Sequence, residues 1–168
     1  TPTEIEYLPG KRTKAWTYGG TVPGPTIRAK TGDRIIVHFK NDLPEPTTIH
    51  WHGMRIPNAM DGAGPATAPI PAGGTFDYSF DALDAGTYWY HPHVAANEQV
   101  DKGLYGAIVI DDPTEPKLPV VADEVLVLDD VMLDPATGEQ MAMKADMRTQ
   151  MMGLEGNLAL VAGRRSNV

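Results

Sequence analysis

Residues 74–80 read Gly-Thr-Phe-Asp-Tyr-Ser-Phe, and this stretch decides the fold class. Phe76, Tyr78 and Phe80 alternate with polar residues, so apolar and polar side chains fall on opposite faces of an extended chain. A period of two over such a run indicates a β-strand with one buried face. We therefore predict a strand at 74–80.

Similar short runs lie on both sides of this stretch, separated by clusters of Gly, Pro, Asn and Asp. They cover residues 25–29, 33–40, 47–52, 86–91 and 104–110. This spacing is typical of an all-β sandwich or small barrel. The 17 glycines and 15 prolines among 168 residues also favour a turn-rich β protein over a helical bundle. We predict a β-sandwich over residues 1–112.

The composition changes after Asp112. Residues 113–122 are acidic and rich in proline, which predicts a stiff linker. Two further strands are predicted beyond it, at 124–128 (EVLVL) and 157–161 (NLALV). The residues after the linker are too few to bury a core of their own. We therefore interpret residues 123–168 as the beginning of a second domain whose remainder is absent.

Composition and charge exclude several classes of function. The net charge is −8, and residues 111–139 account for all of it with nine acidic residues and one basic residue. No basic stripe with interleaved aromatic residues is present, which argues against nucleic acid as a partner. No apolar run is long enough to span a membrane. The absence of cysteine excludes disulfides, iron–sulfur clusters, a thiol nucleophile and thiolate-bound blue copper within these residues.

Four of the five histidines form two His-x-His pairs, His50-Trp-His52 and His91-Pro-His93. Each pair lies at the end of a predicted strand. Residues i and i+2 of a strand share a face, about 6.6 Å apart along the axis. That distance suits two neighbouring metal ions better than one, and imidazole suits copper, zinc, iron or nickel. We predict that the pairs converge on a metal site.

Two neighbouring residues have other predicted roles. Trp51 faces the other way from His50 and His52 and is predicted to pack in the core. His38 has no partner histidine and is predicted to be structural or exposed.

The chain resembles the first domain of a multicopper oxidase. The residues that carry the resemblance are Gly20-Thr-Val-Pro-Gly-Pro-Thr-Ile-Arg28, Ile49-His-Trp-His-Gly53, Thr87-Tyr-Trp-Tyr-His-Pro-His93 and Leu104-Tyr-Gly-Ala-Ile-Val-Ile110. The run Ala59-Met-Asp-Gly62 is similar to bacterial laccase-like and copper-resistance members. The resemblance implies a cupredoxin-like Greek-key sandwich, followed by an incomplete second cupredoxin-like domain.

The resemblance also implies a role for each histidine. His50 matches a ligand of the type 2 copper, His52 and His91 match ligands of one type 3 copper, and His93 matches a ligand of the other. Asp61 matches an acidic residue near the cluster that orients water and relays protons. An Asp-Gly turn explains Asp61 equally well.

The family shares its trinuclear copper cluster between the first and last cupredoxin domains, and only the first set of ligands is present here. The type 1 copper ligands are missing. The remaining ligands are therefore expected from the rest of the same polypeptide or from a second chain that carries the C-terminal cupredoxin domain. The assembled enzyme is expected to oxidise a small reducing substrate, such as a phenol or Cu(I), and to reduce dioxygen to water. This chain alone is expected to be inactive. The family further implies an exported protein, periplasmic or extracellular, with its signal removed.

Two alternatives remain open from the sequence. The first is a non-catalytic cupredoxin-like module that binds copper or serves as a scaffold. The second concerns six methionines within 132–152, which could relay Cu(I) through their thioethers. Met143, Met147 and Met151 are spaced like an apolar stripe on a helix, and we interpret them as packing residues. A copper nitrite reductase is disfavoured because its type 1 ligands are expected in this first domain.

Overall fold

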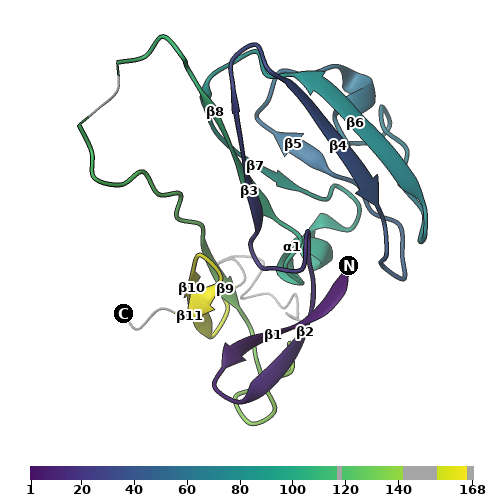
Figure 1. Cartoon of the computed structure of the whole chain (residues 1–168). Helices are drawn as coiled ribbons and strands as arrows, with labels where there is room; N and C mark the ends of the chain where they lie inside the picture. The colour runs from purple at the N-terminus through teal and green to yellow at the C-terminus, as the bar shows by residue number, and fades with distance from the viewer. Residues whose placement is uncertain (117–118, 142–154, 166–168) are drawn as a thin grey trace.

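The computed structural model describes residues 1–116, 119–141 and 155–165 (Figure 1). Its main body is the predicted sandwich of two open sheets. One sheet has the order β3 (Gly24–Lys30), β8 (Gly106–Asp111), β7 (Gly86–His91), β5 (His50–His52), and the other pairs β4 (Arg34–Lys40) with β6 (Thr75–Asp81). β3 and β8 run parallel, and the other pairs are antiparallel.

Strand β6 is the strand predicted from the alternating aromatic residues. It pairs with β4 along its whole length, from Arg34 opposite Asp81 to Lys40 opposite Thr75. Tyr78 and Phe80 are buried, while Asp77 is exposed, so the period of two places the aromatic side chains in the core. The exposed face carries cross-strand pairs such as His38–Asp77, with Nδ1 and Oδ1 2.9 Å apart. His38 is thus exposed, one of the two predicted outcomes.

The principal core lies between the two sheets. Its largest fully buried side chains include Trp51, Tyr78, Phe80 and Ile108. The Trp51 ring packs on Phe80, with ring centroids 4.9 Å apart at 61°. This confirms that Trp51 is a core residue. Because alternate residues of β5 face opposite ways, the same strand directs His50 and His52 away from the core.

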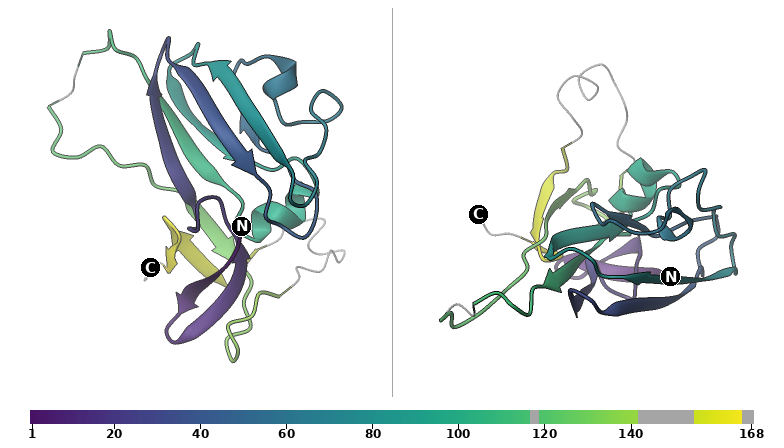
Figure 2. Two further views of the ribbon diagram at one scale, coloured as in Figure 1. Left: turned by 45° about the vertical axis from the view of Figure 1, so that its right-hand side comes forward. Right: turned by 90° about the horizontal axis from the view of Figure 1, so that it is seen from above.

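A second core joins the two ends of the described chain. The hairpin of β1 (Pro2–Leu8) and β2 (Lys11–Trp16) packs beside the sheet of β9 (Leu128–Val131), β10 (Leu158–Val161) and β11 (Arg164–Arg165) (Figure 2). Its buried members are Tyr7, Ala15, Val22, Tyr105, Val131, Leu133 and Leu160. This hairpin was not predicted from the sequence. The described part of the segment after the linker buries its apolar residues in one cluster with Tyr105 and with residues from the first 22 positions of the chain.

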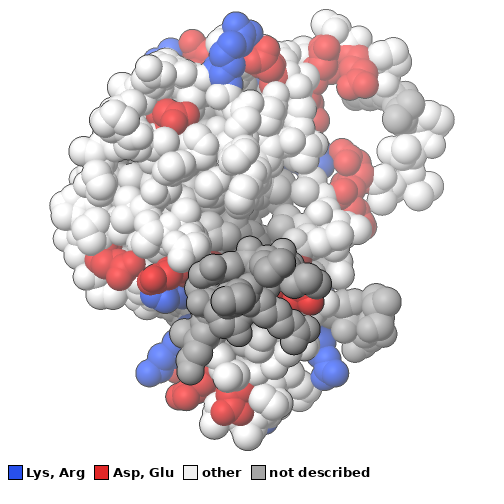
Figure 3. All heavy atoms as spheres, turned by 180° about the vertical axis from the view of Figure 1, so that it is seen from behind, with Lys and Arg blue, Asp and Glu red and all other residues white. Residues whose placement is uncertain are grey.

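The linker runs outside the strands between β8 and β9, and Figure 3 shows acidic side chains gathered along it. Arg28 on β3 anchors its far end through Asp123, with Nη1 and Oδ2 3.1 Å apart. The strand predicted at 124–128 overlaps the observed β9 only at Leu128, because the ladder with β10 begins there. The predicted methionine stripe of Met143, Met147 and Met151 lies outside the described residues. No helix in the described ranges is long and apolar enough to cross a membrane.

Candidate metal centre

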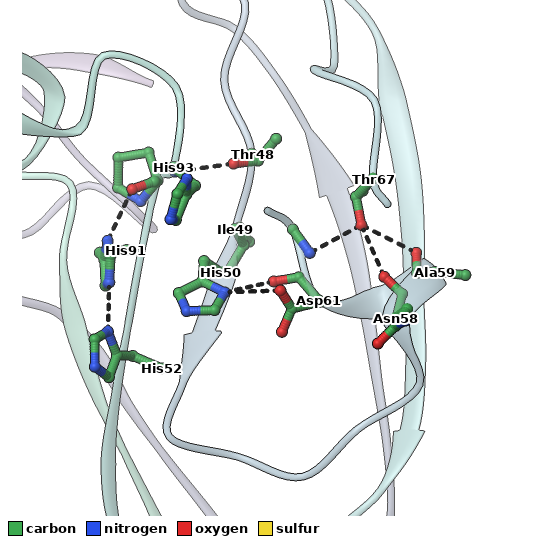
Figure 4. Close-up of polar contacts among 12 residues, drawn as sticks. Thr48, Ile49, His50, His52, Asn58, Ala59, Asp61, Thr67, His91 and His93 are labelled. Carbon is green, nitrogen blue, oxygen red and sulfur yellow. Dashed lines mark hydrogen bonds and ion pairs between the residues drawn. The ribbon is translucent and has the colours of Figure 1, made fainter. Parts of the chain in front are cut away.

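The register of β5 and β7 brings the two His-x-His pairs together (Figure 4). His50 lies directly opposite His91 in this antiparallel pair, and His93 follows the end of β7. The His50 ring is central, and its centroid lies 5.5 Å from that of His52 and 5.3 Å from those of His91 and His93. The predicted convergence is therefore present in the structure.

Three of the four histidines lie close enough to share one ion. His50, His52 and His91 each offer a ring nitrogen, and these nitrogens all lie within 4.8 Å of one another. The spacing of residues i and i+2 along a strand predicts two neighbouring ions for each pair. In the structure the rings of His50 and His52 lean toward each other, so that their centroids are closer than the about 6.6 Å that separates residues i and i+2 along a strand. His93 lies beside this group but outside it.

Backbone carbonyl groups fix the tautomers of two of these rings. His50 Nδ1 lies 2.7 Å from the carbonyl oxygen of Asp61, and His91 Nδ1 lies 2.8 Å from that of Pro92. A carbonyl oxygen accepts hydrogen bonds and donates none. Each Nδ1 therefore carries the proton and donates it, which leaves Nε2 with a free lone pair in the neutral ring. That is the protonation state a metal ligand requires.

The position of the proton on the His52 ring follows from that on the His91 ring. His52 Nδ1 lies 3.1 Å from His91 Nε2. Since His91 Nε2 carries no proton, His52 Nδ1 is the donor. Nδ1 is therefore protonated in all three rings. In the structure the lone pair of His91 Nε2 accepts a hydrogen bond from His52.

The four histidines differ in burial. His91 is the most buried of them, and its burial keeps its ring neutral. His91 is 7 % exposed, His50 is half-buried, and His52 and His93 are exposed. Burial, and then the charges of the neighbouring histidines, lower the pKa of His91 from 6.5 to about 4, although the Pro92 carbonyl opposes this shift. His91 is therefore able to bind a metal through Nε2 well below neutral pH.

Asp61 lies beside His50 (Figure 4). Besides the carbonyl contact, its carboxylate Oδ2 lies 3.4 Å from His50 Nδ1. A tight loop holds it there. Gly62 has φ +75° and sits so close to β5 that a Cβ would lie 1.8 Å from the Ile49 carbonyl oxygen. Thr67 Oγ1 accepts the Gly62 N–H at 3.0 Å and closes the loop.

Two residues that the sequence analysis did not single out support His93. Its backbone N–H donates to Thr48 Oγ1 at 3.0 Å. The neighbouring Thr47 hydroxyl donates at 2.7 Å to Gln99 of helix α1 (Ala96–Asp101), and Gln99 is fully buried. Gln99 Nε2 also donates to Glu45 and to the Pro46 carbonyl, each at 2.9 Å. No spacing signal in the sequence connects Gln99 with residues some fifty positions away, so this contact could not have been predicted.

Comparison with known proteins gives one consistent result. A family model described as multicopper oxidase matches residues 1–115. The multicopper oxidase MmcO of Mycobacterium tuberculosis is 50 % identical over 129 residues, which cover 77 % of this chain and 25 % of MmcO. Copper resistance protein A of Escherichia coli is 45 % identical over 105 residues, covering 62 % of this chain and 17 % of that protein. The crystal structure of a multi-copper oxidase from Pseudomonas thermotolerans superimposes with a TM-score of 0.91 at 38 % identity, over 99 % of this chain and 40 % of that one. This chain spans about a quarter or less of the two curated relatives.

Proposed function

The chain belongs to the multicopper oxidase family, and from that premise we propose that it supplies half of the ligands of a trinuclear copper cluster. The complete oxidase would take single electrons from a small reducing substrate, a phenol or a metal ion such as Cu(I), and reduce dioxygen to water. The observation that carries this proposal is the convergence of four imidazoles on the rim of one sheet, with Nδ1 held by a hydrogen bond in three of them.

The residues present fit copper. Neutral imidazole is a preferred copper ligand, and three ring nitrogens lie within 4.8 Å of one another. In this proposal His50 holds the type 2 copper, His52 and His91 hold one type 3 copper, and His93 holds the other. The rings of His52 and His91 lie side by side, with centroids 5.4 Å apart, and this proximity supports assigning them to the same ion. Bound copper supplies the redox chemistry that reduces dioxygen.

The other groups of the chain act on protons and on ring orientation. The Asp61 carbonyl holds the proton of His50 on Nδ1, and the Pro92 carbonyl does the same for His91. The half-buried Asp61 carboxylate, 3.4 Å from His50 Nδ1, is placed to accept and release protons at the edge of the cluster. Because His91 is buried, water is excluded from the side of the site where His91 lies.

The remaining ligands and the type 1 copper are proposed to come from the rest of the polypeptide or from a second chain with the C-terminal cupredoxin domain. We assign residues 1–112 to the first cupredoxin-like domain, 113–122 to the linker and 123–168 to the start of the second domain. The core that the N-terminal hairpin shares with β9 and β10 supports treating the last part as a segment that packs on the first. An exported, periplasmic or extracellular location follows from the same family assignment.

Substitution of the two paired histidines in the complete oxidase tests the proposal. We expect His52→Ala and His91→Ala to abolish oxygen consumption while the blue absorption of the type 1 copper is retained. His38→Ala is the control, since His38 is exposed and pairs only with Asp77 among the described residues. Full turnover in both variants would show that the ligand assignment is wrong.

A non-catalytic copper-binding module is the second candidate function. It is favoured by the three nitrogens of His50, His52 and His91, which can hold one ion without any ligand from elsewhere. Copper titration of the purified chain separates the two candidates. A module binds one copper ion tightly by itself, whereas half of a trinuclear site binds copper weakly until the partner half is added.

A further inference from the structure

Trp89 lies against both members of the His52–His91 pair. Its ring stacks on that of His91, with centroids 3.9 Å apart and planes at 25°. The His52 ring lies 5.2 Å from the indole, tilted by 33°. The two imidazoles are themselves 5.4 Å apart at 38°, so three rings from two strands lie in a roughly parallel group.

The strand register explains why one side chain touches both rings. Trp89 precedes His91 by two residues on β7, and residues two apart on a strand share a face. Trp89 is also the cross-strand partner of His52 on β5. Directly opposed side chains on one face of an antiparallel pair are close neighbours. The indole is therefore adjacent to His91 along its own strand and to His52 across the sheet.

Core packing does not account for this tryptophan. Trp89 is 40 % exposed, whereas Trp51 on the neighbouring strand is fully buried. A half-exposed indole contributes less to stability than a buried one, because less of its apolar surface leaves water. What distinguishes Trp89 is its contact with the two imidazoles.

Each side of the His91 ring then has its own restraint. The Pro92 carbonyl holds Nδ1, His52 donates to Nε2, and the Trp89 indole covers a face of the ring. Binding a metal through Nε2 uses the lone pair that accepts from His52, so that contact is lost on binding. The hydrogen bond to the Pro92 carbonyl and the stacking contact with Trp89 remain when a metal is bound. Of these two contacts, only the stacking contact sets the plane of the His91 ring.

We propose that Trp89 is a positioning residue, which orients His52 and His91 as one pair for metal binding. This inference rests on the proposed function, in which these two rings hold the same ion. Residues that orient metal ligands from outside typically change metal affinity by about 10–100-fold when they are replaced. A flat aromatic ring is the required feature, so phenylalanine should substitute and an aliphatic residue should not.

The test compares Trp89→Leu and Trp89→Phe in the purified chain, titrated with Cu²⁺ against a competing chelator. We expect Trp89→Leu to weaken binding by about tenfold or more, and Trp89→Phe to stay within about threefold of the unmodified chain. The electron paramagnetic resonance spectrum of bound Cu²⁺ should change in the leucine variant only. Trp16→Leu is the matched control, because Trp16 lies on β2 and packs against Lys102, with Nζ 3.9 Å from the ring centroid.

A measurement without metal provides a second readout. The ring N–H that His52 donates to His91 should give a protected proton signal in the unmodified chain and in Trp89→Phe, and lose it in Trp89→Leu. If Trp89→Leu does not fold, Trp89→Val takes its place, since a β-branched residue suits a strand. Failure of the unmodified chain to bind Cu²⁺ at these histidines even after the partner half has been added would overturn the proposed function. Equal affinity and an unchanged ring N–H signal in a folded aliphatic variant would overturn the role of Trp89 alone.

Discussion

At the scale of single residues, the site depends on backbone groups as much as on the histidines. The proton on His50 Nδ1 is held by the Asp61 carbonyl, and that carbonyl is held in place by the glycine that follows it. Gly62 has a positive φ, and it approaches β5 so closely that only a hydrogen fits. The position of the proton on the His50 ring therefore depends on the presence of glycine at position 62.

We predict that Gly62→Ala lowers the free energy of unfolding by about 2–4 kcal/mol and displaces the Asp61 loop. Gly73→Ala is the matched control, because Gly73 also has φ +75° but has open space where its Cβ would lie. The control should lose only about 1 kcal/mol, the cost of the left-handed backbone. Urea denaturation measures both values. Equal losses would mean that the close contact with Ile49 has no energetic effect.

A second prediction concerns the pH dependence of His91. Its pKa is lowered to about 4 in the folded chain, so between pH 6.5 and 4 the unfolded chain binds the extra proton more readily. Stability therefore falls as the pH falls through this range. We expect a loss of about 1–2 kcal/mol, allowing for solvent screening at the open side of the cluster.

The measurement is the difference in urea stability between the unmodified chain and His91→Gln at pH 7 and pH 4.5. Taking the difference cancels groups that titrate in both proteins. His38→Gln serves as the control, since His38 is an exposed histidine that lies outside the cluster and pairs with Asp77. A pH-independent difference would mean that His91 titrates normally in the folded chain.

At the scale of elements, helix α1 holds the loop that leads into β5. Gln99 satisfies its side-chain oxygen with the Thr47 hydroxyl and its amide with Glu45 and the Pro46 carbonyl, while being fully buried. Buried polar groups that lose a partner cost about 1–3 kcal/mol each. The helix therefore fixes the position of Thr48, which accepts the His93 N–H.

We predict that Gln99→Leu lowers the free energy of unfolding by about 2–3 kcal/mol, because it leaves Thr47 and Pro46 without their partner. The His93 amide should also exchange its hydrogen faster, since Thr48 is no longer held. Asn97→Ala on the exposed side of the same helix should change stability by less than about 0.5 kcal/mol. Unchanged exchange at His93 would show that the helix does not position this residue.

The elements also show where prediction from sequence succeeds. Strands with a strong alternation or a dense apolar run, such as β6 and β8, were found at nearly their observed bounds. The four histidines were recognised because their i, i+2 spacing is local. The hairpin β1–β2 was missed although its two strands are adjacent in the sequence, because the residues that it packs against, such as Val131 and Leu160, are distant. The strand at 124–128 was placed too early because its ladder partner, β10, is distant as well. Likewise, ring tautomers and the Trp89 stack depend on cross-strand register, which no local pattern contains.

At the scale of the whole molecule, a group of acidic and phenolic side chains connects the sandwich to the segment after the linker. The Tyr105 hydroxyl donates to Asp129 of β9, and Gln140 Nε2 donates to the carbonyl and carboxylate of Asp101 at 2.7 and 3.3 Å. Burial, and then the charges of Asp129 and Asp130, raise the pKa of Asp101 to about 6, while Gln140 and Lys102 oppose this shift. Burial also raises the pKa of Asp129.

These shifts give the opposite pH dependence from His91. Between pH 3.8 and 6 the folded chain binds the Asp101 proton more readily than the unfolded chain does, so stability falls as the pH rises through this window. Above pH 6 the folded chain carries the full repulsion among these carboxylates. Because Asp101 belongs to the sandwich while Asp129 and Asp130 belong to β9, the repulsion acts across the contact that holds the two parts together.

We therefore predict that β9 and β10 open more readily at pH 7.5 than at pH 4.5, by about 1 kcal/mol after allowance for the solvent exposure of Asp101. Hydrogen exchange of the β9 and β10 amides, corrected for the intrinsic effect of pH, measures this opening. Asp101→Asn should reduce the pH dependence, because the amide cannot ionise, and the raised pKa of Asp129 accounts for what remains. Asp112→Asn, at an exposed position just before the linker, should preserve it. If Asp101→Asn retained the full pH dependence, the repulsion would have to come from Asp129 and Asp130 within β9, and the carboxylates would not control the contact between the sandwich and the segment that follows it.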